Sequence, residues 1–222
     1  HTAKIAKKFG ANSYDTFKNF LTADLDLVVE VATIEVIKEF TIPILERKIP
    51  LIVSSIGAFS DMKFLNKVKS ISQENNVHVY IPSGAVGGLD VIQSANVLNG
   101  LREVELITRK PASTLDGSEH MDKEKVVFSG QAKDAIQLYP RNMNVAIAIS
   151  LAGIGVERTS VQLIADPNIE NNIHTIKAQG DFGEFQMEVI NEAMPQNPKT
   201  SYLAALSVLS SIKEQNRRIK IV

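Results

Sequence analysis

The sequence contains no cysteine, and this absence removes two classes of protein at once. A disulfide-stapled scaffold cannot form, and neither can a metal site held by thiolates. A chain without disulfides fits a reducing compartment, and we expect a cytoplasmic protein. No apolar run is long enough to span a bilayer and no signal-peptide pattern opens the chain, so we expect no membrane partner.

An excess of charge of one sign is also lacking. The 222 residues include 24 Lys and Arg against 25 Asp and Glu, which gives a formal net charge of −1. Because the two signs are mixed along the chain, with no basic block, we expect no nucleic-acid partner. Hydrophobic residues make up 44% of the chain, and its length suits one large core or two modest domains.

The first third of the chain predicts alternating strands and helices. Continuous apolar runs predict strands buried on both faces, over 25–32, 49–57 and 77–84. Amphipathic patterns predict helices between them, over 33–47 and 61–75. This order is typical of a parallel sheet of the Rossmann type, so residues 1–83 are expected to form a dinucleotide-binding domain.

Beyond Gly88 the pattern changes to strands with one wetter face. Strands are predicted over 101–110, 125–130, 156–167, 172–179 and 184–190. We expect residues 84–195 to form an α+β domain with a mostly antiparallel sheet that binds substrate and dimerises. Residues 196–222 should pack back on the dinucleotide-binding domain as a helix over 201–217. Its predicted inward side chains are Leu203, Leu206, Leu209 and Ile212.

Each of the three parallel strands ends in small or polar residues, at 30–33, 54–57 and 83–84. The carboxyl ends of parallel strands share one edge of a sheet, so these clusters should form a common rim. We expect Ala32 and Gly57 to face a cofactor there. The segment IPSGAVGGLD (81–90) brings three glycines to this rim, where backbone can approach a ligand closely. A tight strand-to-helix turn is the alternative.

His174 is the strongest candidate for proton transfer. It begins a predicted hairpin strand after the polar Asn171 and Asn172, and it is one of four histidines. Histidine is the side chain suited to moving protons near neutral pH. The alternative is a structural histidine bonded to backbone.

Two further segments offer candidate ligand contacts. In PKTSYLAALS, Pro198 should begin a helix that Thr200 or Ser201 caps, and Lys199 adds a positive charge where a substrate carboxylate could bind. A simple cap with a solvated lysine is the alternative. In RNMNVAIA, Asn144 either caps a buried helix or turns its amide toward a ligand.

Four segments in this order resemble the L-aspartate dehydrogenase family, from about residue 25 to the C-terminus. They are IPSGAVGGLD, VVFSGQAKDAIQLYPRNMNVA, ENNIH and NPKTSYLAALS. The resemblance implies NAD(P)-dependent oxidation of L-aspartate to iminoaspartate, the reverse reductive amination of oxaloacetate, a place in NAD biosynthesis and a homodimer. It implies that His174 is the catalytic acid/base and that Ala85 and Asn144 contact the NAD or NADP. Ser83, Gly84, Lys199, Thr200 and Ser201 are then expected to hold the substrate, without a metal ion.

One family feature is missing from the sequence as given. A GxGxxG turn after the first strand holds the pyrophosphate in such domains, and none precedes residue 25. We therefore expect the N-terminal βαβ unit, roughly 30 residues, to be absent from this sequence. Two alternatives to the aspartate enzyme stay open. One is a non-catalytic relative that binds a dicarboxylate, and the other is a dehydrogenase for another small amino or keto diacid.

Overall fold

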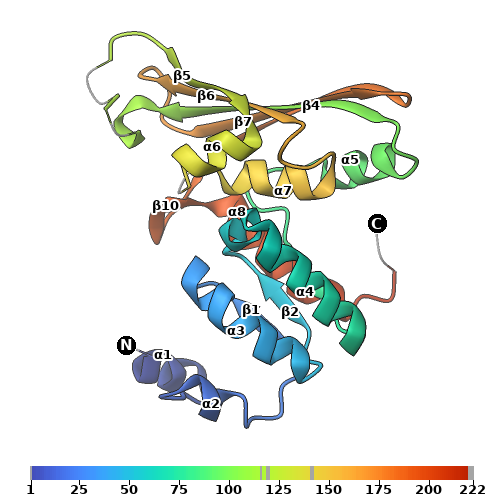
Figure 1. The fold of residues 1–222 in the computed structure, drawn as a ribbon. Coiled ribbons are helices and arrows are strands. Elements are labelled where there is room, and N and C mark those ends of the chain that lie inside the picture. The colour runs from blue at the N-terminus through green and yellow to red at the C-terminus, as the bar shows by residue number, and fades with distance from the viewer. Residues whose placement is uncertain (1, 116, 119–120, 141–142, 220–222) are drawn as a thin grey trace.

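The computed structural model describes residues 2–115, 117–118, 121–140 and 143–219, with the backbone alone for 198–199. Figure 1 shows two main sheets, a small parallel one in the N-terminal part and a larger mixed one above it, and β9 and β10 form a further two-stranded sheet. The described helices are α1 (Thr2–Phe9), α2 (Phe17–Phe20), α3 (Ile34–Glu46), α4 (Met62–Asn75), α5 (Leu89–Asn96), α6 (Ala132–Leu138), α7 (Asn144–Ala152) and α8 (Tyr202–Gln215), with the 3-10 helices η1 (Ile56–Ser60) and η2 (Ala112–Thr114). The described strands are β1 (Val28–Glu30), β2 (Leu51–Val53), β3 (Val79–Tyr80), β4 (Leu101–Pro111), β5 (Lys125–Gln131), β6 (Thr159–Asp166), β7 (Asn172–Gly180), β8 (Gly183–Asn191), β9 (Ala193–Met194) and β10 (Asn197–Ser201). The predicted α/β class is confirmed.

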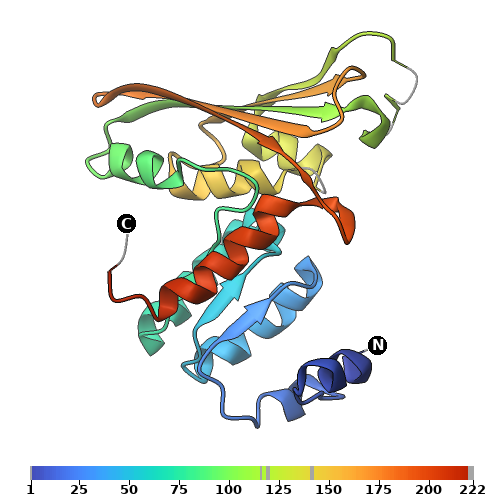
Figure 2. The ribbon, with the colours of Figure 1, turned by 180° about the vertical axis from the view of Figure 1, so that it is seen from behind.

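The parallel sheet has the strand order β1-β2-β3 and is covered on both faces. Helices α3 and α4 lie on one face, and Figure 2 shows α8 across the other, where it contacts β2. Helices α3 and α4 begin where predicted, because Thr33 accepts a hydrogen bond from Val36 N–H and Asp61 accepts one from Phe64 N–H. The three strands are shorter than the predicted apolar runs, and beyond the ends of β1 and β2 the N–H groups of Ala32, Ser54 and Ser55 bond to the Glu30 carboxylate.

The mixed sheet has the order β5-β6-β4-β7-β8, with β4 and β6 parallel and the other pairs antiparallel. Helices α5, α6 and α7 lie beneath one face of it (Figure 1). The predicted hairpin of β7 and β8 is confirmed, and Gly180 is required there because an added Cβ would lie 2.3 Å from Gly100 O. The register sets Thr108 opposite His174, so both side chains point toward the helix-covered face.

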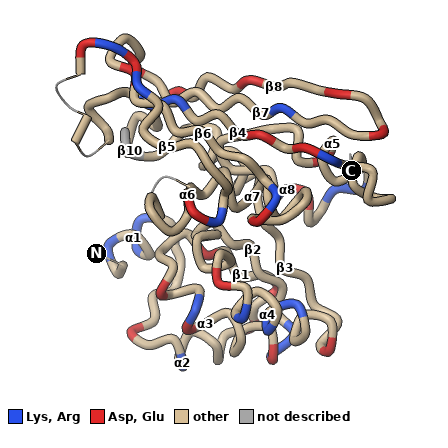
Figure 3. The backbone as a smooth tube through the Cα atoms, turned by 45° about the horizontal axis from the view of Figure 1, so that its top comes forward, with Lys and Arg blue, Asp and Glu red and all other residues tan. Residues whose placement is uncertain are grey.

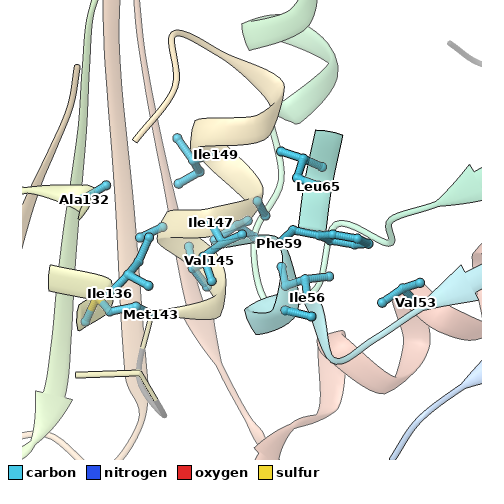
Figure 4. Packing of buried hydrophobic residues seen from close by; sticks show 14 of the residues in the cluster. Val53, Ile56, Phe59, Leu65, Ala132, Ile136, Met143, Val145, Ile147 and Ile149 are labelled. Carbon is cyan, nitrogen blue, oxygen red and sulfur yellow. The ribbon is translucent and has the colours of Figure 1, made fainter. Parts of the chain in front are cut away.

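Helix α7 joins the two sheets into one core. It is buried nearly all round, as its uninterrupted apolar sequence predicted, with Ile147 at 1% and Ile149 at 0% exposure. Figure 4 shows Val145 and Ile147 directed toward Phe59 and Ile56 of η1. This continuous packing fixes the mixed sheet against the end of the parallel one, which sets the geometry of the rim.

The entry to α8 differs from the prediction. Residues 197–201 form β10, which pairs antiparallel with β9, and the helix begins only at Tyr202. Ser201 is the N-cap residue, as one of the two predicted alternatives, but its hydroxyl makes no capping hydrogen bond. Its Oγ donates instead to Asn191 Oδ1 at 2.5 Å, and Thr200 Oγ1 accepts from Asn197 Nδ2. Ser201 therefore bonds to β8, and Thr200 bonds within β10, so neither side chain bonds to the first turn of α8.

The inward face of α8 also differs from the prediction. Ser207 and Val208 are its buried residues, whereas Leu206 and Leu209 are 41% and 54% exposed. The sequence LAALSVL is apolar on more than one side, so its periodicity does not define a single inward face. Ser207 is buried because its hydroxyl accepts a hydrogen bond from Gly84 N–H at 3.1 Å.

Acidic and basic residues are interleaved along the backbone in Figure 3, as the composition predicted. Within the part of the chain that the structure describes, no helix is both long and apolar enough to cross a membrane. No group of three or more His, Asp or Glu among those residues could hold a metal ion.

Candidate active site

A cleft of about 760 Å³ opens at the carboxyl ends of the parallel strands, where the two sheets meet. One wall comes from the parallel sheet and contains Val31, Ala32, Ser54, Ser55, Ser83, Gly84 and Ala85. The other comes from the mixed sheet, α7 and the β10–α8 segment, and contains Lys110, Asn144, Asn172, His174, Thr200 and Ser201. The predicted common rim is therefore confirmed, because residues from all three strand ends line one cleft.

Glu30 ties the first two strand ends of the rim together. Ala32, Ser54 and Ser55 donate their backbone N–H groups to its carboxylate at 2.6, 3.2 and 2.9 Å, and the Ser55 hydroxyl donates at 2.7 Å. The carboxylate is only 7% exposed, so these donors offset the cost of burying its charge. The sequence prediction did not single out Glu30, although an acidic residue at the end of a buried strand was the available signal.

His174 lies in the opposite wall, on β7, with 5% of its surface exposed. Its Nδ1 is 3.1 Å from Thr108 Oγ1, so Nε2 is the nitrogen left for a ligand or a water molecule. Burial, and secondarily the positive charge of Lys110, lower the pKa of His174 from its usual 6.5 to about 4. The ring is therefore neutral at physiological pH, and a neutral imidazole can accept one proton.

Lys110 shares this wall, and the sequence prediction missed it. It follows Leu106 and Thr108 on the same face of β4, so strand alternation carries a lysine to a largely apolar face. Burial lowers the pKa of Lys110. The signal was present in LREVELITRK, where the apolar face formed by Val104, Leu106 and Thr108 continues at Lys110.

The segment from Ser83 to Ala85 is held in the first wall by two distant side chains. Gly84, at φ +69°, donates its N–H to Ser207 Oγ, and Ala85 O accepts from Asn191 Nδ2 at 3.0 Å. Asn191 also binds Ser201, so β8 and the start of α8 together fix this segment. The segment 83–85 therefore turns the chain after β3 and also forms an edge of the cleft that these two hydrogen bonds hold in place.

The other predicted site residues divide into three groups. Ala32, Asn144 and Thr200 line the cleft. Gly57 does not; it lies in η1, where an added Cβ would be 2.5 Å from Ile34 Cδ1 and 3.7 Å from Asn144 Oδ1. The side chain of Lys199 lies outside the described residues.

The two parts of the chain match two family models. Residues 4–82 match the NAD-binding domain of homoserine dehydrogenase, and residues 90–215 match the C-terminal domain of aspartate dehydrogenase. A parallel sheet with a ligand cleft at its carboxyl edge, completed by a second sheet, defines the class: a dinucleotide-dependent oxidoreductase. Because the second model covers more than half of the sequence, the chain belongs to the L-aspartate dehydrogenase family.

Individual relatives agree with this membership. The L-aspartate dehydrogenase of Methanosarcina mazei is 41% identical over 226 residues, covering 94% of this chain and 83% of its own. That of Archaeoglobus fulgidus is 42% identical over 198 residues, covering 88% and 79%. The crystal structure of aspartate dehydrogenase from Thermotoga maritima superposes with a TM-score of 0.80 at 29% identity, over 96% of this chain and 84% of that one.

Proposed function

We propose that the protein catalyses the NAD(P)-dependent oxidation of L-aspartate to iminoaspartate and the reverse reductive amination of oxaloacetate. One observation carries the proposal: a neutral, buried His174 faces, across a single cleft, the small-residue rim where a dinucleotide binds in this fold. Family membership supports the substrate, since the relatives matched over most of the chain are L-aspartate dehydrogenases.

The residues present fit a nicotinamide dinucleotide. The rim at Ala32 and Ala85 carries no bulky side chain, Val31 beside it is 68% exposed, and the cleft volume is in the range of cofactor sites. We assign Ala32, Ala85 and Asn144 to contacts with NAD or NADP, with Gly57 supporting Asn144 from behind. When bound, the cofactor supplies the hydride acceptor for the substrate Cα.

His174 is assigned the proton transfer. Oxidation of the amine to the imine requires the amino group to lose a proton, and hydrolysis of the imine requires a water molecule to lose one. In the tautomer that this role requires, Nδ1–H donates to Thr108 Oγ1, 3.1 Å away, and Nε2 is an acceptor that can take up either proton. Thr108 would then fix the ring orientation, as an orienting group does for a catalytic histidine.

The substrate carboxylates are assigned to polar groups from both walls. Ser83 and Gly84 belong to the rigid edge held by Asn191 and Ser207, and Thr200 and Ser201 line the cleft at the start of α8. Lys199 precedes them in the chain, and we retain it as a proposed carboxylate contact.

We further propose a homodimer formed through the uncovered face of the mixed sheet. The helices lie under the other face (Figure 1), and the register sets Ile173 opposite Ile190, which is 61% exposed. An Ile190→Glu substitution should therefore lower the mass measured by light scattering from two chains to one. A cytoplasmic location and a role in supplying iminoaspartate for NAD biosynthesis complete the proposal.

The test is a spectrophotometric assay of the full-length protein with L-aspartate and either NAD or NADP. We expect formation of the reduced cofactor with at least one of them, and consumption of it with oxaloacetate and ammonia. Binding of a dicarboxylate without turnover would favour a non-catalytic relative. Turnover of a different diacid amine in place of aspartate would favour a dehydrogenase of other specificity.

A further inference from the structure

We propose that Asn172 binds the substrate, with its side-chain amide donating a hydrogen bond to a carboxylate of the diacid on which His174 acts. This assignment rests on the proposed function and adds a residue to its substrate site. In the sequence Asn172 marked only the polar start of a strand, whereas in the structure it belongs to the wall of the cleft.

Strand β7 brings Asn172 and His174 to one face of the mixed sheet. Successive side chains of a strand alternate between its two faces, so residues two apart share a face, and both of these residues line the cleft. The rise of an extended strand sets their Cα atoms about 6 to 7 Å apart. A small diacid whose reacting carbon lies beside the His174 ring would therefore reach Asn172 with one of its carboxylates.

The side chain of Asn172 is not used by the fold. Its neighbours Asn171, His174 and Thr175 each use a side-chain polar atom in a hydrogen bond, whereas the Asn172 side chain bonds to none of the residues that the structure describes. The residue is half-buried in the cleft wall. Two N–H donors and one carbonyl acceptor of its amide are thus available to a ligand.

Asn191 on β8 shows what an asparagine at this level of the sheet does when the fold does use it. The register sets it directly opposite Asn172, so both side chains lie on the same face. Asn191 is 4% exposed, donates to Ala85 O at 3.0 Å and accepts from Ser201 Oγ at 2.5 Å. Asparagine is disfavoured in strands, so each of the two needs a reason to be there. Internal bonds supply it for Asn191, and we infer that a ligand supplies it for Asn172.

The chemistry of an amide suits a carboxylate in this position. No aspartate or glutamate is among the described residues that line the cleft, so a carboxylate placed there meets no lining group of its own charge. A hydrogen bond from an amide to an ionised acceptor is among the stronger kinds. Because the amide is neutral, it binds the carboxylate without opposing protonation of the neighbouring His174, as a further cation would.

The test compares Asn172→Ala and Asn172→Asp in the full-length protein, with Asn66→Asp as the matched control. Asn66 is exposed on α4, away from the cleft. We expect Asn172→Ala to raise KM for L-aspartate roughly 10- to 100-fold, the range for a lost hydrogen bond to a charged group. Asn172→Asp keeps the size of the side chain but sets a negative charge against the carboxylate, so KM should rise roughly tenfold further. Asn66→Asp should keep the wild-type KM.

Stability and cofactor affinity separate substrate binding from a structural role. Because the fold does not use the amide, Asn172→Ala should unfold at the wild-type denaturant midpoint, and its Kd for reduced cofactor should stay within about twofold of wild type. Asn191→Ala should lower the midpoint, since Ala85 O and Ser201 Oγ lose their partner. An Asn172→Ala protein that unfolds as early as Asn191→Ala, or that loses affinity for cofactor in place of aspartate, would overturn the proposal.

Failure of the Asn172 assignment can be told apart from failure of the proposed function. If the wild type oxidises L-aspartate and both Asn172 variants have its KM, only the assignment fails. If the wild type shows no turnover, calorimetric titration with L-malate in the presence of reduced cofactor decides. Weaker binding by Asn172→Asp than by the wild type supports the contact, and equal binding, or no binding by the wild type, refutes it.

Discussion

The two walls of the cleft differ in what they present to a ligand. The wall from the parallel sheet offers backbone and small side chains, and its one buried acid, Glu30, is consumed by internal hydrogen bonds. The wall from the mixed sheet offers titratable side chains, Lys110 and His174, on adjacent strands. In the proposed function, the parallel sheet supplies a surface that a cofactor can approach closely and the mixed sheet supplies the group that moves a proton, while both walls contribute substrate contacts and one core holds them together.

The largest expected effect is a loss of turnover when His174, in the wall from the mixed sheet, is replaced. His174→Ala should lower kcat by roughly 10²- to 10⁴-fold, the usual loss for a missing acid/base, while the Kd for reduced cofactor changes less than about twofold. Steady-state kinetics and fluorescence titration measure the two quantities. If the affinity of His174→Ala for reduced cofactor fell by the same factor as kcat, His174 would not be separate from the cofactor-binding wall.

The next effect comes from the opposite wall. Glu30→Ala leaves the amides of Ala32, Ser54 and Ser55 without their acceptor, and we expect the free energy of unfolding to fall by about 2 kcal/mol. Cofactor affinity should fall with it, because the rim loses its fixed shape. Denaturant unfolding checks the value against Glu46→Ala, an exposed control expected within about 0.5 kcal/mol of wild type. Equal stabilities would remove Glu30 from this role.

A third effect is the pH dependence of stability. The native His174 takes up a proton only near pH 4, whereas the unfolded one does so near 6.5, so the unfolded state binds more protons between these values. Stability should therefore rise from pH 4 to 6.5 and level off above, by about 1 to 3 kcal/mol from this residue. His174→Ala should lack that share of the rise. A constant difference between the two proteins over this window would show that the ring is not buried as described.

The smallest effect concerns a residue behind the rim. Gly57→Ala would place a Cβ 2.5 Å from Ile34 Cδ1, and the required shift should cost about 1 to 2 kcal/mol of stability. Because Asn144 lies on the same side, cofactor affinity should fall modestly as well. Thermal unfolding with and without NAD(P)H measures both. Gly100→Ala is the control, because the Cβ added there would come no nearer than 3.3 Å to another atom, which belongs to the side chain of Asp181.

Much of the fold follows from sequence because its signals are local. The parallel strands, the buried helix over 144–152 and the hairpin at Gly180 each have a period or a turn that needs no distant partner. The rim follows as well, since strand direction alone brings Ser54 and Ser83 together. His174 could be singled out from its polar surroundings and the family resemblance.

The residues that escaped prediction depend on partners far along the chain. Ser207 is buried because it accepts a hydrogen bond from Gly84 N–H. Ser201 is the N-cap residue of α8, as local sequence favoured, but its hydroxyl bonds to Asn191 rather than to the helix. The alternation in LREVELITRK placed Lys110 on the apolar face of its strand, but only the pairing of β4 with β7 shows that this face carries His174. Glu30 likewise acquires its role from β2.

The most direct test of the account is a crystal structure of the full-length protein with reduced cofactor and L-malate. It should place the diacid between Ala85 on one wall and His174 on the other. A diacid bound instead in the shallow hollow of the mixed sheet near Lys177 and Gln186, or a cofactor far from Asn144, would contradict it.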